Sequence, residues 1–431
     1  MNIFRPKIIS ALKSYNSTKF ANDIVAGIIV AIIALPLSIA LAIASGAQPV
    51  QGLYTAIVAG FVIALLGGSN VNISGPTAAF ATIVAGVIAK NGFSGLVIAT
   101  IMAGLILIIM GLCRMGSLIR FIPHNITVGF TSGIAVTILI GQIKDFLGLK
   151  FSVGANPVEA SEKVVEICRS IGTIDWKTVV VGIIGLGILI GWPLIGKAVK
   201  GKASFIFIKI PPSIIAVIIG IFIVMLSPLK ADTIGSRYVI EGGFPKFNFP
   251  AFSLETVINV LPDAFTIAIL AAIESLLSCV VSDGMIGDKH NSNTELIAQG
   301  AGNICSGLFG GIPATGAIAR TAANVKNGGR SPISGMVHAV VLLLVLLVLM
   351  PYAGLIPMPI IAAVLFMVAY NMSEWKEFLK ICKTSDVGSI IVLVITFALT
   401  IVFNLVIAIA IGLVLSVIFN LAKKIKSKNK Q

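Results

Sequence analysis

Two clusters of small and polar residues interrupt otherwise apolar stretches of this chain. The first reads Ser74-Gly75-Pro76-Thr77-Ala78-Ala79, and the second reads Pro313-Ala314-Thr315-Gly316-Ala317. Ser74 and Thr77 are residue types that cap helix starts. Pro76 suits the first turn of a helix, because the N–H that it lacks is not needed there. A short apolar run follows each cluster, so we expect a helix to begin at each.

A helix that begins inside a membrane is suited to holding a negative ion. Its first N–H groups have no partner within the helix, and its dipole presents a positive end, which attracts anions. Two such ends around one pocket would suit a small oxyanion or a halide. The residues that we predict to contact the substrate are Ser74, Thr77, Ala78, Thr315, Gly316 and Ala317. The alternative is that both clusters are tight packing corners without a ligand, although non-helical backbone at membrane depth lines a cavity or is buried in protein.

Three further residues could act on ions. Glu274 lies within the strongly apolar run 267–281, where a carboxylate is costly and is a functional candidate by default. Ser278 follows one turn later on the same helical face, so the pair could bind Na⁺, or Glu274 could exchange a proton. Arg320 follows the second helix start by about one turn, and could either add positive charge beside the anion or pair with Glu274.

The composition places these residues in a lipid environment. The 431 residues are 57% hydrophobic and 11% charged, with a mean hydropathy of +1.05, whereas soluble domains carry roughly 25% charged residues. The net charge of +14 lies in loops and tails, without the interleaved aromatic residues of a nucleic-acid surface. No phosphate-binding loop, nucleophile elbow or metal-ligand spacing appears. We therefore expect a transporter driven by ion gradients, or a channel, without a cofactor, and neither an enzyme nor a nucleic-acid partner.

The apolar runs predict about fourteen membrane segments, since roughly 20 apolar residues cross a bilayer. Clear spans lie near 23–44, 50–66, 94–112, 125–147, 177–196, 210–228, 256–281, 331–350, 385–402 and 404–421, and shorter or broken segments lie near 74–89, 295–309, 315–325 and 357–370. With this even number both termini share one side, and 21 of the 31 Lys and Arg residues then lie on that side. The positive-inside rule makes it the cytoplasmic side of a plasma or inner membrane.

An internal match indicates two inverted repeats. Leu65-Leu66-Gly67-Gly68 precedes the first polar cluster, and Leu308-Phe309-Gly310-Gly311 precedes the second. Seven segments separate the two copies, so their orientations in the membrane are opposite. Inverted repeats with interrupted helices point to a transporter's binding site. The predicted parts are a cytoplasmic segment 1–20, a first repeat 21–228, an extracellular connector 229–253, a second repeat 254–421 and a basic cytoplasmic tail 422–431.

Over residues 20–420 the chain resembles the SulP family of anion transporters, the sulfate permeases. The segments that carry the resemblance are Ala34–Ala42, Gly52–Thr55, Ser74–Ala78, Glu274-Ser275, Gly311–Gly316 and Arg320-Thr321. The resemblance implies an all-α fold of fourteen segments in two inverted repeats of seven, divided into a core and a gate domain. The third and tenth segments would be half-helices preceded by short strands. It also implies an elevator movement of the core against the gate, and a homodimer.

The same resemblance implies roles for particular residues. Thr77, Ala78, Thr315, Gly316 and Ala317 would lie beside the anion, and Glu274 and Ser278 would lie where some members bind Na⁺ and others use a proton. Sulfate is the first expectation for the substrate. The family's C-terminal STAS domain is missing from the printed sequence, which we expect to reflect a natural short form, a removed domain or one that is encoded separately.

Several alternatives stay open from the sequence. Many relatives carry Gln or Glu and an aromatic residue at two positions where this chain has Leu37 and Leu41. In this it resembles a bacterial subgroup that includes sulfate, bicarbonate and C4-dicarboxylate carriers. The partner could therefore be another small inorganic or organic anion. An anion channel and a nucleobase permease of the same fold are the remaining alternatives, although Thr315–Ala317 offers no carboxylate to a nucleobase.

Overall fold

The fold is known from a computed structural model that describes most of the chain. The described residues are 4–13, 15–117, 123–153, 157–199, 210–240, 242–402 and 405–428. Within them, eight helices are long and apolar enough to cross a membrane, and three more apolar helices are shorter. The strands found there have two residues each. The prediction of an all-α membrane protein is therefore confirmed.

The elements before the middle of the chain begin with a short helix outside the apolar region. In order they are α1 (Lys7–Lys13), α2 (Ser17–Ala44), α3 (Pro49–Leu66), β1 (Ser74–Gly75), η1 (Ala78–Phe80), α4 (Ala81–Leu112), α5 (His124–Leu147), α6 (Ala160–Ser170), η3 (Ile171–Thr173), α7 (Trp176–Ala198) and α9 (Pro212–Leu226). The backbone at Gly92 has φ 66° and ψ −178°, which breaks α4 into two helices. The break lies between the predicted segments 74–89 and 94–112.

The second part repeats the pattern of two long helices followed by a strand and a short helix. Its elements are α10 (Ile234–Arg237), α11 (Leu254–Ile286), α12 (Ser292–Leu308), β2 (Thr315–Gly316), α13 (Ile318–Lys326), α14 (Pro332–Ala353), α15 (Met358–Met372), α16 (Trp375–Thr384), α17 (Val387–Val402) and α18 (Leu405–Lys428). Each of the fourteen predicted segments has a helical counterpart. The predicted tail from 422 is a continuation of α18 as far as Lys428, and 429–431 lie outside the described residues.

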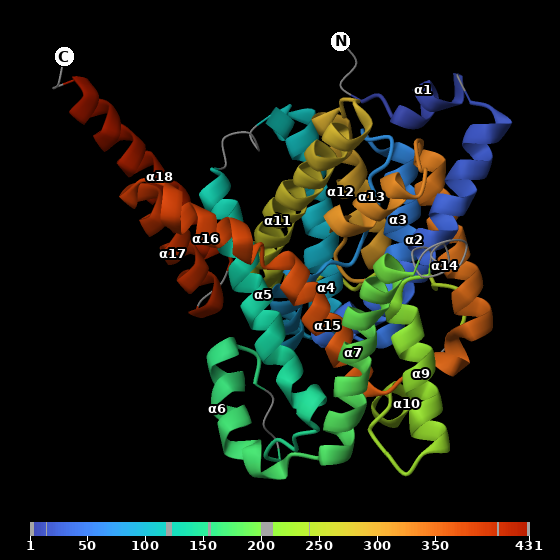
Figure 1. The fold of residues 1–431 in the computed structure, drawn as a ribbon. Helices are drawn as coiled ribbons and strands as arrows, with labels where there is room; N and C mark the ends of the chain where they lie inside the picture. The colour runs from blue at the N-terminus through green and yellow to red at the C-terminus, as the bar shows by residue number, and fades with distance from the viewer. Residues whose placement is uncertain are drawn as a thin grey trace.

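Three polar stretches hold helices that hydropathy alone did not reveal. The stretch 150–175 contains α6, and the connector 229–253 contains α10. The polar residues that follow α15 form the amphipathic α16. Lys/Arg positions 120, 200, 202, 209 and 430 of the predicted cytoplasmic set lie outside the described residues. Figure 1 shows both termini at one end of the molecule and α6 and α10 at the other end, as an even number of crossings requires.

The helices pack into two groups that each take elements from both repeats. The core group consists of α2, α3, α4, α11, α12, α13 and α14, whose strongest contacts join α4 with α12 and α11, and α14 with α2 and α3. The gate group consists of α5, α7, α9, α15, α17 and α18, in which α5 packs on α15 and α17. Contacts between the groups are sparser and involve mainly α2 with α9 and α15. The groups correspond to the expected core and gate.

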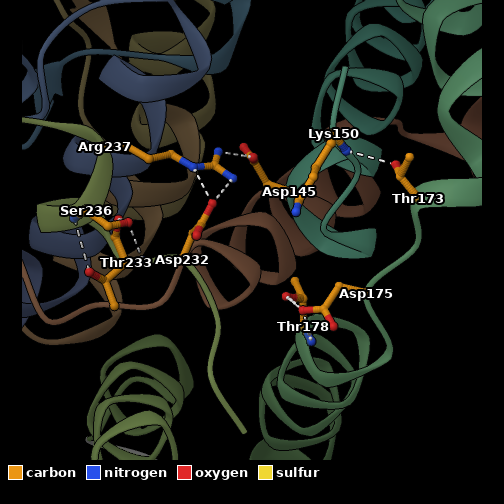
Figure 2. A network of polar contacts seen from close by, with 9 residues as sticks. All are labelled: Asp145, Lys150, Thr173, Asp175, Thr178, Asp232, Thr233, Ser236 and Arg237. Carbon is orange, nitrogen blue, oxygen red and sulfur yellow. Dashed lines mark hydrogen bonds and ion pairs between the residues drawn. The ribbon is translucent and has the colours of Figure 1, made fainter. Parts of the chain in front are cut away.

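Two of the linkers that run between these groups are joined to each other. The N–H of Ile234 donates to the carbonyl of Ile356, and the N–H of Gly235 donates to the carbonyl of Gly354. Arg237 donates to Asp232 through Nε and Nη2. Its Nη1 also pairs with Asp145 near the end of α5, as Figure 2 shows. Burial alone would lower the pKa of Arg237, but the two carboxylates outweigh it and raise that pKa.

Candidate anion site

The two predicted helix starts meet at the centre of the core group. Strands β1 and β2 pair antiparallel, with Ser74 opposite Gly316 and Gly75 opposite Thr315. The N–H of Ala317 extends this pairing by donating to the carbonyl of Ile73. Neither η1, with N-cap Thr77, nor α13, with N-cap Ala317, receives a hydrogen bond from a capping side chain. The N–H of Phe80 bonds to the carbonyl of Thr77, and the other N–H groups of the two first turns are left for another partner.

A buried polar network holds the two strands in place. The Asn72 amide donates to Glu295 over 2.8 Å, and its oxygen accepts from the hydroxyls of Ser278 (2.8 Å) and Thr321 (3.1 Å). On the other strand, Asn303 binds both the N–H and the carbonyl of Ala314, over 2.8 and 2.9 Å. Buried polar groups that are hydrogen-bonded to one another specify a single arrangement, so this network fixes where each half-helix begins.

Glu295 provides an acidic anchor for the same network. It is fully buried and accepts hydrogen bonds from the N–H of Gly68, from Asn72 and from Gln299, at 2.8–2.9 Å. Gln299 in turn donates to the hydroxyl of Ser74 over 2.9 Å. Three donors satisfy the carboxylate without a basic partner, which is how a buried carboxylate is tolerated.

A cavity of about 290 Å³ lies in front of the two helix starts. Its core side is formed by Pro76, Thr77 and Ala78 from the first half and by the segment 316–320 from the second. Leu37 and Leu41 of α2 close one side. The facing gate side is formed by α5 and by the end of α15, so the cavity lies between the two groups of helices. The volume is near the lower end of the range for small-molecule sites.

Arg320 brings positive charge to this cavity. Its side chain is 1% exposed, and Nη2 donates to the carbonyl of Pro76 over 2.6 Å. Its Nε and Nη1 have no hydrogen-bond partner. Buried donors are almost always paired, so two free donors on a cationic side chain that lines a cavity are suited to an anion.

Glu274 faces the same cavity and contacts the first helix start. Its carboxylate accepts a hydrogen bond from the Thr77 hydroxyl over 2.9 Å. Arg320 lines the same cavity, but no direct ion pair joins these two described residues. The cavity therefore combines one basic and one acidic side chain with two uncapped helix starts.

The structure brings together only part of the predicted set. Thr77, Ala78, Gly316, Ala317, Arg320 and Glu274 line the cavity. The hydroxyl of Thr315 lies 2.8 Å from that of Ser275 and donates to α11, while Ser74 and Ser278 belong to the buried network. The hydroxyls of Ser74 and Thr77 were expected to cap the helix, but Ser74 lies within β1 and Thr77 bonds to Glu274.

The gate side contributes residues that the sequence reading missed. Thr131 on α5, Asn371 near the end of α15 and Glu374 before α16 all line the cavity. Glu374 has φ 45°, a left-handed conformation that is uncommon for a residue other than glycine. No motif marks these positions, because they join the site only when the gate packs against the core.

Comparison with known proteins places this geometry in a family. The model of the sulfate permease family matches residues 20–395. The chain belongs to the sulfate permease family. This confirms the family resemblance, and with it a membrane transporter rather than an enzyme.

Two relatives in this family are named as anion transporters. The putative sulfate transporter YvdB of Bacillus subtilis is 45% identical over 400 residues, which cover 91% of this chain and 72% of the relative. The bicarbonate transporter BicA of Picosynechococcus is 33% identical, over 87% of this chain and 66% of the relative.

Solved structures agree with the fold. The transmembrane domain of a cyanobacterial bicarbonate transporter BicA aligns with a TM-score of 0.76 at 29% identity, covering 94% of this chain and 98% of that domain. SLC26A9 aligns with a TM-score of 0.85 over 95% of this chain and 67% of its own, at 20% identity, which supports the fold alone.

Proposed function

We propose that this sulfate permease family member is a secondary transporter that carries a small inorganic anion in the cavity between its two half-helices. One observation carries the proposal: two guanidinium nitrogens of Arg320 have no hydrogen-bond partner and are buried beside two helix starts that lack a side-chain cap. A preorganised set of donors replaces the hydration shell of an anion without further rearrangement. Ser74 and Thr315 contribute indirectly, by positioning the strands that precede these starts.

The arrangement of helices supports an elevator movement. Core and gate are packed densely within themselves and sparsely against each other, and the cavity lies on their boundary. The core carries both half-helices, so that a shift of the core would carry the bound anion with it. Dense groups with sparse mutual contacts move as rigid bodies.

Glu274 is the proposed coupling group. Protonation of Glu274 or binding of Na⁺ would cancel its negative charge beside the anion, so the anion and the cation would bind together. The Thr77 hydroxyl connects the two events, because it bonds to Glu274 at the start of the first half-helix. Ser278 is hydrogen-bonded to Asn72 behind the site, and would support this region rather than coordinate the ion directly.

Sulfate is the proposed substrate, because the relative YvdB, which is 45% identical, is named a putative sulfate transporter. Bicarbonate is the second candidate, since BicA relatives match in both sequence and structure. We also propose that both termini face the cytoplasm, because most Lys and Arg residues share their side, and that the chain forms a homodimer, as its family resemblance implies.

Uptake into proteoliposomes tests the function. The full chain is reconstituted, and radiolabelled sulfate, bicarbonate, fumarate and chloride are supplied with and without an inward proton or Na⁺ gradient. Gradient-dependent accumulation of sulfate is the expected result. If none of the four anions accumulates, the proposal is overturned. Unitary currents far above the turnover of a carrier, measured in electrical recordings, would show that the protein is a channel.

A further inference from the structure

A second pocket lies behind the wall of the anion cavity and differs from it in chemistry. It has a volume of about 220 Å³ and is lined by α9 of the gate and by α2, α3 and α14 of the core. Every lining residue is apolar apart from the hydroxyl of Tyr352. A site without polar partners does not retain water, so a hydrocarbon group is the occupant that its chemistry favours.

The mouth of this apolar pocket opens toward the lipid. Ile218, Leu349 and Tyr352 line it and are 45%, 47% and 63% exposed in the isolated chain. They belong to α9 and α14, which are apolar helices of the membrane region. The solvent at the mouth is therefore the interior of the bilayer, and its most abundant component is the acyl chain.

We propose that the acyl chain of a membrane phospholipid inserts into this pocket and acts as a wedge between core and gate. No charged side chain lines the pocket, so the contact selects a hydrocarbon chain and not a particular headgroup. The chain already lies in an apolar solvent, so its affinity for the pocket comes from the closer dispersion contacts with the lining side chains.

The position of α2 connects the wedge with the anion site. Leu35 and Ile39 line the apolar pocket, whereas Leu37 and Leu41 line the anion cavity. These pairs point to opposite faces of one helix, because residues two apart lie about 200° around its axis. Pro36 between them removes one hydrogen bond from the helix and makes it easier to bend. An acyl chain packed against one face of α2 therefore influences the position of the opposite face, which forms a wall of the anion cavity.

The pocket also contacts a linker between the two groups. Ala353 and Ile356 line it and belong to the end of α14 and the turn before α15. The carbonyl of Ile356 is held by the N–H of Ile234 in the other linker. Movement of the core against the gate changes the shape of this pocket, so a bound chain stabilises the arrangement described here.

Native mass spectrometry of the purified full chain tests the wedge without reference to transport. The protein is stripped of lipid by repeated detergent exchange and is then loaded with dioleoylphosphatidylcholine or dioleoylphosphatidylglycerol. Val217→Phe and Val345→Phe fill the pocket from α9 and from α14, and Val348→Phe is the control because Val348 is 67% exposed and lies outside the pocket.

We expect the wild type and Val348→Phe to retain one phospholipid of either headgroup at collision energies that remove the rest. Each folded filling variant should lose it, and should lose the rise in unfolding temperature on adding lipid that binding to the native state produces. Absence of a retained lipid in the wild type overturns the proposal. So does equal retention by either folded filling variant, or retention of only one of the two headgroups.

Discussion

The hydroxyl of Thr77 donates to the carboxylate of Glu274 over 2.9 Å, and this contact joins the start of the first half-helix to the middle of α11. Thr77 belongs to the first repeat and Glu274 to the second, 197 residues later. The residue that we propose for cation coupling therefore touches the residue that begins the proposed anion site. A change in the charge of Glu274 acts directly on that helix start.

Glu274→Gln should abolish accumulation driven by a proton or Na⁺ gradient while leaving anion exchange in place. The amide keeps an acceptor for Thr77 and has the same shape, but it cannot take up a proton or offer a charge to Na⁺. Accumulation and counterflow in proteoliposomes measure the two activities separately. Glu255→Gln, at the exposed start of the same helix, is the matched control. Gradient dependence that survives in Glu274→Gln removes the coupling role.

Arg320→Gln should weaken anion binding strongly. A hydrogen bond to a charged group contributes about 1.5–3 kcal/mol, which corresponds to roughly a 10- to 150-fold higher dissociation constant. Equilibrium binding of labelled sulfate to the purified protein measures the change. Lys326→Gln removes a positive charge from the exposed far end of the same helix and should leave affinity nearly unchanged. Equal affinities of wild type and Arg320→Gln would show that Arg320 does not bind the anion.

Glu374→Gln should increase anion affinity, because it removes a negative charge from the gate side of the cavity. Charges about 4 Å apart interact by about 1 kcal/mol in water, so the gain should be about two- to fivefold at low ionic strength. It should shrink as salt is added, since salt screens exposed charges. Binding isotherms at two salt concentrations measure it. A decrease in affinity, at any salt concentration, would contradict this account of Glu374.

Gly316→Ala should destabilise the chain as well as stop transport. A Cβ there would lie 2.8 Å from Nδ2 of Asn72 and 3.0 Å from the Cα of Ser275, neither of which has room to move. Overpacking of this kind costs about 1–3 kcal/mol. The unfolding temperature and uptake of the variant report the two effects. Gly86→Ala in α4, where the new atom meets nothing within 4 Å, should leave both unchanged or slightly improve stability.

The sequence was a good guide to the helices and to the half-helix starts, for physical reasons. Apolar length alone marks a membrane segment, and the cluster of small residues around Pro76 marks a helix that begins late. The expectation that Pro76 lies in the first turn was wrong, because it precedes the N-cap Thr77. The helix break near residues 89–94 was also expected, since the predicted segments 74–89 and 94–112 are separate, and the structure places the break at Gly92. These signals are local, so a single sequence contains them.

The sequence was a poor guide to side-chain direction within the site. Ser74, Thr315 and Ser278 have the chemistry of ligands, but they bond to the buried network around Asn72, Gln299 and α11. Whether a hydroxyl faces the cavity or the network depends on strand pairing and on partners that lie between 40 and 225 residues away in the sequence. Glu374 was missed for the same reason, because only the packing of gate against core brings it to the cavity.

The position of a heavy-atom anion tests the central claim most directly. Selenate has the shape and charge of sulfate, and its selenium can be located by anomalous X-ray diffraction from crystals of the chain grown with it. The account predicts one anomalous peak in the cavity bounded by Thr77, Ala78, Ala317 and Arg320, within hydrogen-bonding distance of the first-turn N–H groups. A selenate ion bound tightly elsewhere, with no peak in this cavity, would contradict it.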